Sequence, residues 1–175
     1  MDTSILFNEK QRFTQWWLVL ILAFVNILIV SILIVELNSK SIGPAKPISA
    51  PVVVFVTLLS IAISASIFLI QLETTIKTDG IYVRFFPFQN SYRHIKWNEL
   101  SKSYVRTYNP ITEYGGWGYR LGLFGKGKAY NVAGNKGLQL EFKDGKKLLI
   151  GTQKPGDVET ALQLVSPLQK EQVYT

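Results

Sequence analysis

Two long uncharged runs of apolar residues constrain the fold of this chain more than any other feature. They are Trp16–Val35 (WWLVLILAFVNILIVSILIV) and Val52–Leu72 (VVVFVTLLSIAISASIFLIQL). A helix of twenty residues rises about 30 Å, which matches the hydrocarbon thickness of a bilayer. The sequence therefore predicts two transmembrane helices, over residues 16–35 and 52–72.

The rest of the chain divides around these runs. Residues 1–15 are expected to form an N-terminal tail, and residues 36–51 a short external loop. That loop contains Gly43, Pro44 and Pro47 and is too short for a domain, so the two helices should form an antiparallel hairpin. Residues 73–175 should form the soluble domain. The first run is longer than the 7–15 apolar residues of a signal peptide and has no A-x-A site after it, so we expect it to be retained.

Basic residues give the expected orientation. Lysine and arginine are equally frequent in the N-terminal tail and in the loop at 36–51, but Lys77 and Arg84 follow the second run closely. Under the positive-inside rule this favours a multi-pass protein of the cytoplasmic membrane with both termini in the cytoplasm. The absence of cysteine and of Asn-x-Ser/Thr acceptor sites agrees with a cytoplasmic domain.

Polar and small residues mark the middle of both runs. Asn26 lies near the middle of the first run, and Ser60 and Ser64 lie at a matching depth in the second. Small residues four positions apart let helices approach closely, so Ser60 with Ser64 and Ala62 with Ser66 are the expected transmembrane packing pairs. We expect Asn26 to form a hydrogen bond with a serine of the second run, worth about 0.6–2 kcal/mol. Since neither run contains an ionisable residue, packing is favoured over transport.

After Gln71 the pattern is that of short strands. Asp79-Gly80 and Asp144-Gly145 each lie between two apolar stretches, which is a strong signal for a two-residue hairpin turn. Further strand candidates lie between the two hairpins, at residues 92–97, 102–108, 117–122 and 128–132.

The period changes near the C-terminus. Pro155 can open a helix, and Val158, Ala161, Leu162 and Val165 form one apolar stripe at helical spacing. Ser166-Pro167 should end it. The predicted fold class is α+β: a transmembrane α-hairpin, then about seven antiparallel strands in a barrel or sandwich, capped by a C-terminal amphipathic helix.

Three segments carry a resemblance to a known family: LFNEKQRFTQWW, RTYNPITEYGGWG and AYNVAGNKGLQLEFKDGKKLLIGTQKP. With them, nearly the whole chain resembles uncharacterised bacterial membrane proteins that join a helical hairpin to a PH-like (pleckstrin-homology-like) domain. The resemblance implies a membrane-anchored cytoplasmic domain and no particular chemistry. The phosphoinositide pattern of some PH domains, Lys…Lys/Arg-x-Arg around the first hairpin, is not found between Lys77 and Arg84.

Catalytic chemistry has little support in the sequence. Thiolate chemistry is excluded because there is no cysteine. GLFGKGKA (residues 122–129) has alanine where a phosphate-binding loop needs Ser or Thr, so a flexible glycine hairpin is expected there. His94, the only histidine, is expected on an exposed strand, because its neighbours Arg93 and Lys96 do not form a metal or base site. We expect no catalytic residue, no metal, no cofactor and no enzymatic activity.

The segment VRTYNPITEYGGWGYRLG, Val105 to Gly122, is the candidate binding site. Asn109-Pro110 should end a strand, and Glu113 to Gly116 should turn a long loop. The aromatic rings and glycines could close the sandwich, contact a protein or peptide, or rest on the bilayer. The candidate ligand- or partner-binding residues are Arg106, Tyr108, Asn109, Tyr114, Gly115, Gly116, Trp117, Tyr119 and Arg120.

These observations favour a non-catalytic, membrane-anchored PH-like module for binding or scaffolding. Its expected partners are the lipid bilayer and a protein or peptide at the Tyr108–Arg120 loop. The alternatives are a structural subunit assembled through the hairpin, and a lipid- or membrane-surface-binding module. The part after Gln71 carries +6 of the chain's net +7, which suits contact with anionic lipid. That modest charge on a tethered domain does not favour nucleic acid.

Overall fold

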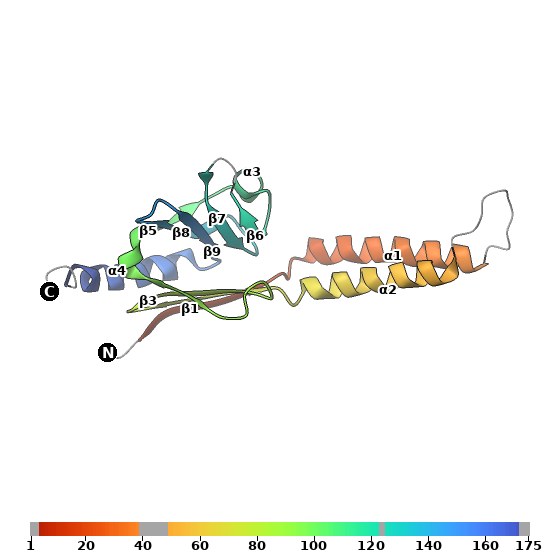
Figure 1. The fold of residues 1–175 in the computed structure, drawn as a ribbon, viewed down its shortest axis with the longest axis horizontal. Helices are drawn as coiled ribbons and strands as arrows, with labels where there is room; N and C mark the ends of the chain where they lie inside the picture. Colours follow the sequence, from red (N-terminus) through yellow and green to blue (C-terminus); the bar gives the residue numbers. More distant parts are fainter. Residues whose placement is uncertain (1–3, 39–48, 123–124, 172–175) are drawn as a thin grey trace. The chain divides into compact units, whose positions relative to one another are not determined.

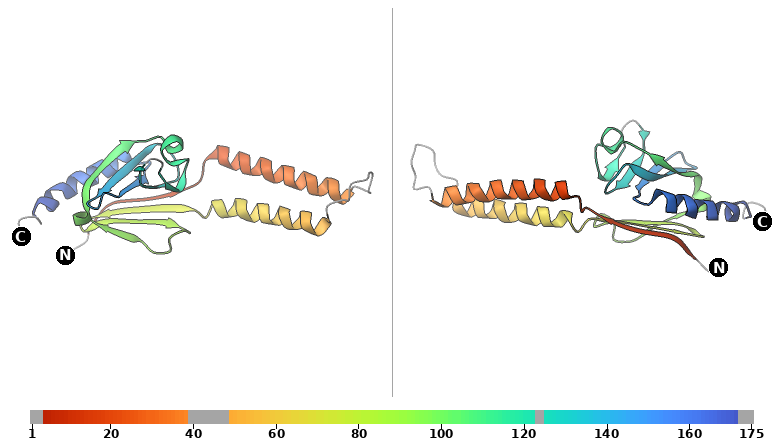
Figure 2. Two further views of the ribbon diagram at one scale, coloured as in Figure 1. Left: turned by 45° about the horizontal axis from the view of Figure 1, so that its top comes forward. Right: turned by 180° about the vertical axis from the view of Figure 1, so that it is seen from behind.

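The computed structural model describes residues 4–38, 49–122 and 125–171. The chain forms two compact units. One is the sheet unit, Met1–Phe13 with Ile70–Thr175, and the other is the helical unit, Thr14–Leu69, inserted between them. Figures 1 and 2 show the elements of both units.

The helical unit consists of α1 (Trp16–Asn38) and α2 (Ala50–Ile67), which pack side by side (Figure 1). Both are long and apolar enough to cross a membrane. The second prediction, residues 52–72, extends too far, because α2 ends at Ile67 and Leu72 lies in a strand. Leu72 is fully buried in the sheet core. Its apolar character therefore serves a protein interior, and hydropathy alone does not distinguish that from lipid.

The predicted polar contact between the two helices is confirmed. The Asn26 side-chain amide donates to Ser64 Oγ at 2.8 Å, and Asn26 Oδ1 accepts from Ser60 Oγ at 3.0 Å. The second predicted pair, Ala62 with Ser66, is exposed and does not lie on this contact face. A residue two positions along a helix is rotated by about 200°, so only one of the two pairs can face α1. The Ser66 hydroxyl instead donates to Ile63 O of its own helix.

Sheet 1 is antiparallel, in the order β1-β2-β3-β4. Its strands are Ile5–Arg12, Gln71–Lys77, Gly80–Phe86 and Arg93–Lys96. The expectation of a separate N-terminal tail at residues 1–15 is wrong, because β1 belongs to this sheet and pairs Arg12 with Gln71. Two of its buried positions are the polar residues Glu9 and Gln11. The strand therefore lacks the alternation of apolar and polar residues by which a strand is recognised in sequence. Glu9 and Gln11 are both buried, and they bond to Thr152 Oγ1 and Gly151 O.

Sheet 2 has the order β5-β8-β9-β7-β6. Its strands are, in that order, Leu100–Thr107, Lys136–Phe142, Lys147–Gly151, Lys128–Asn131 and Gly118–Leu121. The pair β7–β9 is parallel, so the prediction of uniformly antiparallel strands is wrong at this point. Among the described residues the two sheets do not close into a barrel. Both predicted hairpins are confirmed, since β2 joins β3 and β8 joins β9, but neither has a two-residue Asp-Gly turn. The pair Lys77–Gly80 leaves Thr78 and Asp79 as the first turn, and the second loop is longer, because Phe142 N donates to Lys146 O.

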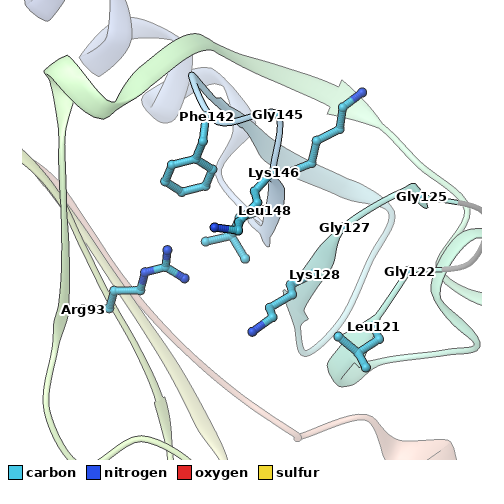
Figure 3. Close-up of a pocket in the computed structure, with 11 residues that line it drawn as sticks. Arg93, Leu121, Gly122, Gly125, Gly127, Lys128, Phe142, Gly145, Lys146 and Leu148 are labelled. Atoms are coloured by element: carbon cyan, nitrogen blue, oxygen red, sulfur yellow. The ribbon is translucent and has the colours of Figure 1, made fainter.

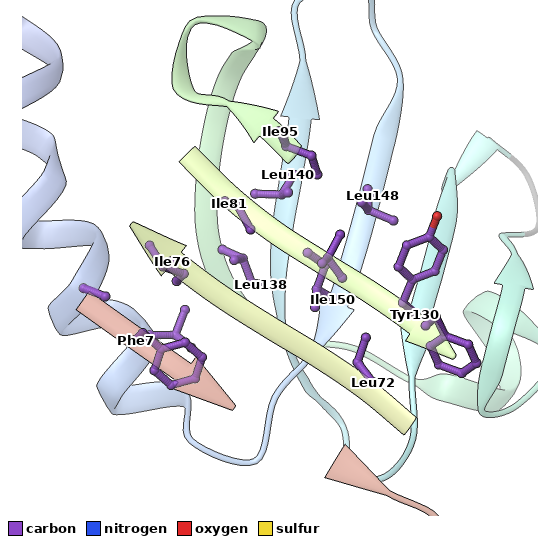
Figure 4. Close-up of a cluster of buried hydrophobic side chains, with 14 of the residues drawn as sticks. Phe7, Leu72, Ile76, Ile81, Ile95, Tyr130, Leu138, Leu140, Leu148 and Ile150 are labelled. Atoms are coloured by element: carbon purple, nitrogen blue, oxygen red, sulfur yellow. The ribbon is translucent and has the colours of Figure 1, made fainter. Parts of the chain in front are cut away.

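The core lies between the two sheets and α4 (Pro155–Glu171) (Figure 4). It includes Ile81, Ile95, Leu140 and Ile150, all nearly or fully buried. The predicted stripe of α4 is confirmed, since Val158, Ala161 and Val165 are buried and Leu162 packs against the core. The predicted end at Ser166-Pro167 is wrong, because α4 continues to Glu171. A proline removes one helical hydrogen bond, and it marks a helix boundary only as a tendency.

Candidate functional site

The aromatic segment contains a short helix in place of the expected open loop. Helix α3 (Pro110–Tyr114) begins after Asn109, whose side chain accepts from the backbone N–H groups of residues 111 and 112. It ends at Gly115, which has φ = 69°. Glycine adopts this left-handed conformation at little cost. Asn109 and Gly115 therefore have local structural roles as the two caps of α3.

The two tyrosines that flank α3 are buried. Tyr108 and Tyr114 pack edge to face, with ring centroids 5.9 Å apart, and form a small second core with Ala129 and Leu149. Leu149 alternates with the inward-facing Leu148 and Ile150, so this second core covers the outer face of sheet 2. Tyr108 and Tyr114 therefore pack against the outer face of sheet 2, and they do not close the sandwich as the structural interpretation of this segment predicted.

Arg106 is held by groups of its own domain. Its guanidinium lies 2.9 Å from a Glu113 carboxylate oxygen, 3.1 Å from Tyr114 Oη and 2.9 Å from Gln139 Oε1. The hydrogen bond from Arg106 lowers the pKa of Glu113, although burial opposes the shift. A bidentate arginine–carboxylate pair of this kind is among the stronger polar contacts in proteins.

The remaining predicted residues lie along the path back into sheet 2. Trp117 Nε1 donates to Gly134 O, and Arg120 Nε donates to Trp117 O. Tyr119 stacks on Tyr130 at 4.8 Å, on the side of the main core. Gly116 N donates to Pro110 O and tightens the end of α3. A shallow cavity of about 430 Å³ borders this segment, but most of the candidate residues are engaged in internal contacts.

A second region, which the sequence analysis did not single out, has the opposite character. A cavity of about 580 Å³ lies at one end of the space between the two sheets (Figure 3). We call it the basic pocket. Its lining residues are Arg93, Leu121, Gly122, Gly125, Gly127, Lys128, Phe142, Gly145, Lys146, Lys147 and Leu148.

The alternation of side chains along β4 and β7 explains why two cationic side chains point toward this space. Arg93 pairs with Val83 on β3, whose side chain is in the core. Lys128 pairs with Leu148 on β9, which is likewise in the core. Directly paired residues share one face of a sheet, so both cations occupy positions that face the interior of the sandwich. Each of the two is the first residue of its strand, and both side chains are exposed to solvent.

The four cations of the basic pocket differ in their partners. Lys146 Nζ lies 2.6 Å from Asp144, and Lys147 Nζ lies 4.0 Å from Glu141. Arg93 and Lys128 have no carboxylate within ion-pair distance in the part of the chain that the structure describes. The Arg93 guanidinium lies 5.4 Å from the centre of the Phe142 ring, and Figure 3 shows Arg93 and Lys128 reaching toward the same space.

Glycines form one wall of the basic pocket. The segment between β6 and β7 is the glycine hairpin expected at residues 122–129, and Gly122 N donates to Gly127 O at 2.5 Å. A Cβ on Gly127 would lie 2.2 Å from Lys147 O, so the backbone approaches β9 more closely than any side chain allows. Residues 123 and 124 of this hairpin lie outside the described residues.

His94 lies on β4, as expected, but it is half-buried and not exposed. Its ring stacks on Tyr82 at 4.2 Å, and its Nε2 lies 3.7 Å from Asp79. The described residues contain no group of three His, Cys, Asp or Glu side chains that could hold a metal ion.

No family model, curated protein or solved structure matches this chain. The resemblance to membrane proteins with a PH-like domain therefore stays a prediction.

The basic pocket is the stronger candidate site on chemical grounds. Arg93 and Lys128 come from different sheets and face one space, and no lining residue that the structure describes is acidic. Two cations in this arrangement repel each other, so a bound anion would lower the electrostatic energy of the folded domain. The sequence does contain a signal for the position of Lys128. In KAYNV, Lys128 lies two positions before Tyr130, and alternate residues of a strand lie on the same face of the sheet.

Proposed function

We propose that this chain is a membrane-anchored, non-catalytic binding module whose PH-like sheet unit takes an anionic ligand in the basic pocket. Two sheets packed around a core with a C-terminal helix support the PH-like assignment. The parallel β7–β9 pair is a departure from the antiparallel strands that the resemblance implies.

One observation carries the proposal. Arg93 and Lys128 are exposed cations on the inner side of their sheets, and they have no carboxylate partner among the described residues. Arg106, in contrast, has three side-chain partners in the same unit. Edge strands do use inward-pointing charges to prevent unwanted strand pairing, which would account for Arg93 on the edge strand β4. Lys128 lies on β7, between β9 and β6, and is not explained in that way.

The helical unit supports an anchoring role. Both polar atoms of the Asn26 side chain are satisfied within the hairpin, by Ser60, Ser64 and Leu22 O. A partner helix is thus not needed to satisfy this polar group inside a bilayer. This favours an anchor over the alternative, a structural subunit assembled through the hairpin.

The test uses the full-length protein in a neutral detergent, with inorganic pyrophosphate as the probe. A ligand that binds only the folded state raises the melting temperature, and the rise grows with the logarithm of the ligand concentration once that exceeds the Kd. We expect pyrophosphate to raise the melting temperature of the wild type, and the double variant Arg93→Met, Lys128→Met to lose most of this response. Equal responses of the two proteins would refute the proposed site.

The matched control is the double variant Lys102→Met, Lys154→Met. Both lysines are exposed and lie outside the lining of the basic pocket, and the variant has the same net charge as the pocket variant. It should respond to pyrophosphate like the wild type. If it loses the response as well, the effect comes from overall charge and not from the pocket.

A further inference from the structure

The rim of the basic pocket is apolar and exposed, which bears on what kind of anion it takes. Leu121 lines the pocket and is 69% exposed. Tyr119 lies two residues earlier on β6 and therefore on the same face as Leu121. Phe88 is 64% exposed, and its ring lies 6.1 Å from that of Tyr119. The three side chains form a path from the mouth of the pocket across the end of the sandwich; we call it the apolar rim.

The apolar rim is connected to the pocket through one ring cluster. Tyr119 stacks on Tyr130, whose hydroxyl accepts a hydrogen bond from Gln89. Burial raises the pKa of Tyr130, so the hydroxyl stays neutral beside the cations. Tyr130 and Lys128 share the inner face of β7, which places the rim and the cationic end of the pocket on one continuous surface.

This surface has a cationic part, which is stabilised by an anion, and an apolar part, which is stabilised by contact with an apolar group. A small inorganic anion would neutralise Arg93 and Lys128 but would leave Phe88 and Leu121 in water. A ligand that joins an anionic group to an apolar group would meet both requirements, because removing apolar surface from water is favourable. The arrangement therefore selects for an amphiphile over a free anion.

The chain supplies a source for such a ligand. Only residues 13–15 and 68–70 separate the strands of the sheet unit from helices that are long and apolar enough to cross a membrane. A basic domain tethered in this way meets anionic phospholipids at high local concentration.

We propose that the basic pocket holds the head group of an anionic phospholipid while the apolar rim of Phe88, Tyr119 and Leu121 contacts its chain. This rests on the proposed function, since it specifies the class of anion that the pocket takes. An acidic peptide with an apolar side chain is the competing ligand, and the test below identifies it if it binds.

The test is site-specific photo-crosslinking of the full-length protein in detergent micelles that contain equal amounts of phosphatidylglycerol and phosphatidylcholine. A photo-reactive residue replaces Leu121, and a control replaces Ile111, which is 64% exposed but lies on α3. Mass spectrometry then identifies the lipid attached at each position. We expect phosphatidylglycerol to exceed phosphatidylcholine about tenfold at position 121, with no preference at position 111.

Two variants separate the parts of the proposal. Arg93→Met with Lys128→Met should abolish the preference for phosphatidylglycerol at position 121. With the photo-reactive residue in place of Tyr119, Phe88→Ser with Leu121→Ser should reduce lipid adducts there while leaving the melting response to pyrophosphate intact. Both serine substitutions are at exposed positions, so the domain should still fold.

Each remaining outcome decides the question. Equal adducts of the two lipids at position 121, or a preference that survives loss of both cations, would overturn the lipid assignment. A peptide adduct at position 121 in membranes would replace it with the competing ligand. If pyrophosphate still stabilises the wild type in either case, the anion site stands and only the lipid assignment fails.

Discussion

The aromatic segment around α3 and the basic pocket use the same kinds of residues in opposite ways. In the first, Arg106 is enclosed by Glu113, Gln139 and the Tyr114 hydroxyl. In the second, Arg93 and Lys128 face the inside of the sandwich without a carboxylate partner among the described residues. The aromatic segment looks functional in sequence because it is rich in Tyr, Trp and Gly, yet most of its groups are satisfied internally.

The two regions therefore differ in how much free energy a bound ligand could contribute. A charge that already has good partners gains little from a ligand, because the ligand must displace those partners. Arg93 and Lys128 have no carboxylate partner among the described residues, so an anion would not have to displace one.

Tyr114→Ala should destabilise the sheet unit by about 3 kcal/mol or more, because it empties the second core and removes a partner of Arg106. Urea unfolding of the full chain in detergent, read by pulse proteolysis, measures the change. A loss below about 1 kcal/mol would mean that the ring is not a packing element, and the aromatic segment would again be the leading candidate site.

Arg106→Met should cost about 2 kcal/mol, since it leaves the half-buried Glu113 without its main partner. The matched variant Arg93→Met should change the unfolding free energy by less than about 0.5 kcal/mol, because no buried carboxylate is left unpaired by it. The same urea experiment measures both. Equal losses in the two variants would remove the contrast between the two regions.

Glu73 on β2 gives a third charged cluster for comparison. Burial alone would raise its pKa, but hydrogen bonds from Tyr92, Lys10 and Arg84 outweigh it and hold the pKa at about 2, against an ordinary 4.5. A lowered carboxyl pKa gives stability that is fully present above the unfolded value and is lost as pH falls through the folded one. Stability should therefore fall by on the order of 2 kcal/mol between about pH 4.5 and pH 2.

Melting curves of the wild type and of Glu73→Gln across this pH range test the prediction. The variant should be less stable at neutral pH and should lose less on acidification. A wild type and a variant with parallel pH profiles would show that the Glu73 cluster does not link β1, β2 and β3 in the way the geometry indicates.

Lys128→Met should have the smallest effect on stability, a gain of up to about 0.5 kcal/mol at low salt, because it relieves repulsion with Arg93. The gain should shrink as salt is added, since ions screen the repulsion. Unfolding at two salt concentrations measures it. A loss of more than about 1 kcal/mol would show that Lys128 has a structural partner, and that the pocket is not poised for an anion.

Part of the candidate site was open to prediction. The strand over residues 102–108, the break at Asn109-Pro110 and the glycine hairpin at 122–129 follow from local turn chemistry and alternation. The partners of Arg106 and the inward placement of Arg93 could not be predicted from the sequence. Each depends on a residue that another strand brings close: Gln139 on β8 for Arg106, and Val83 on β3 for Arg93.

Elements with a local signal could be predicted from the order of the residues alone. Two apolar helices, the β2–β3 and β8–β9 hairpins and the buried stripe of α4 all follow from spacing along the chain, because neighbouring residues decide helix periodicity and favour a turn. Only the tertiary structure decided that β1 joins a sheet across the inserted helices and that β7 pairs in parallel with β9. Strand pairing joins residues far apart in sequence, so local patterns do not specify it. The partners of the buried Glu9 and Gln11, Thr152 and Gly151, are known only from the folded structure.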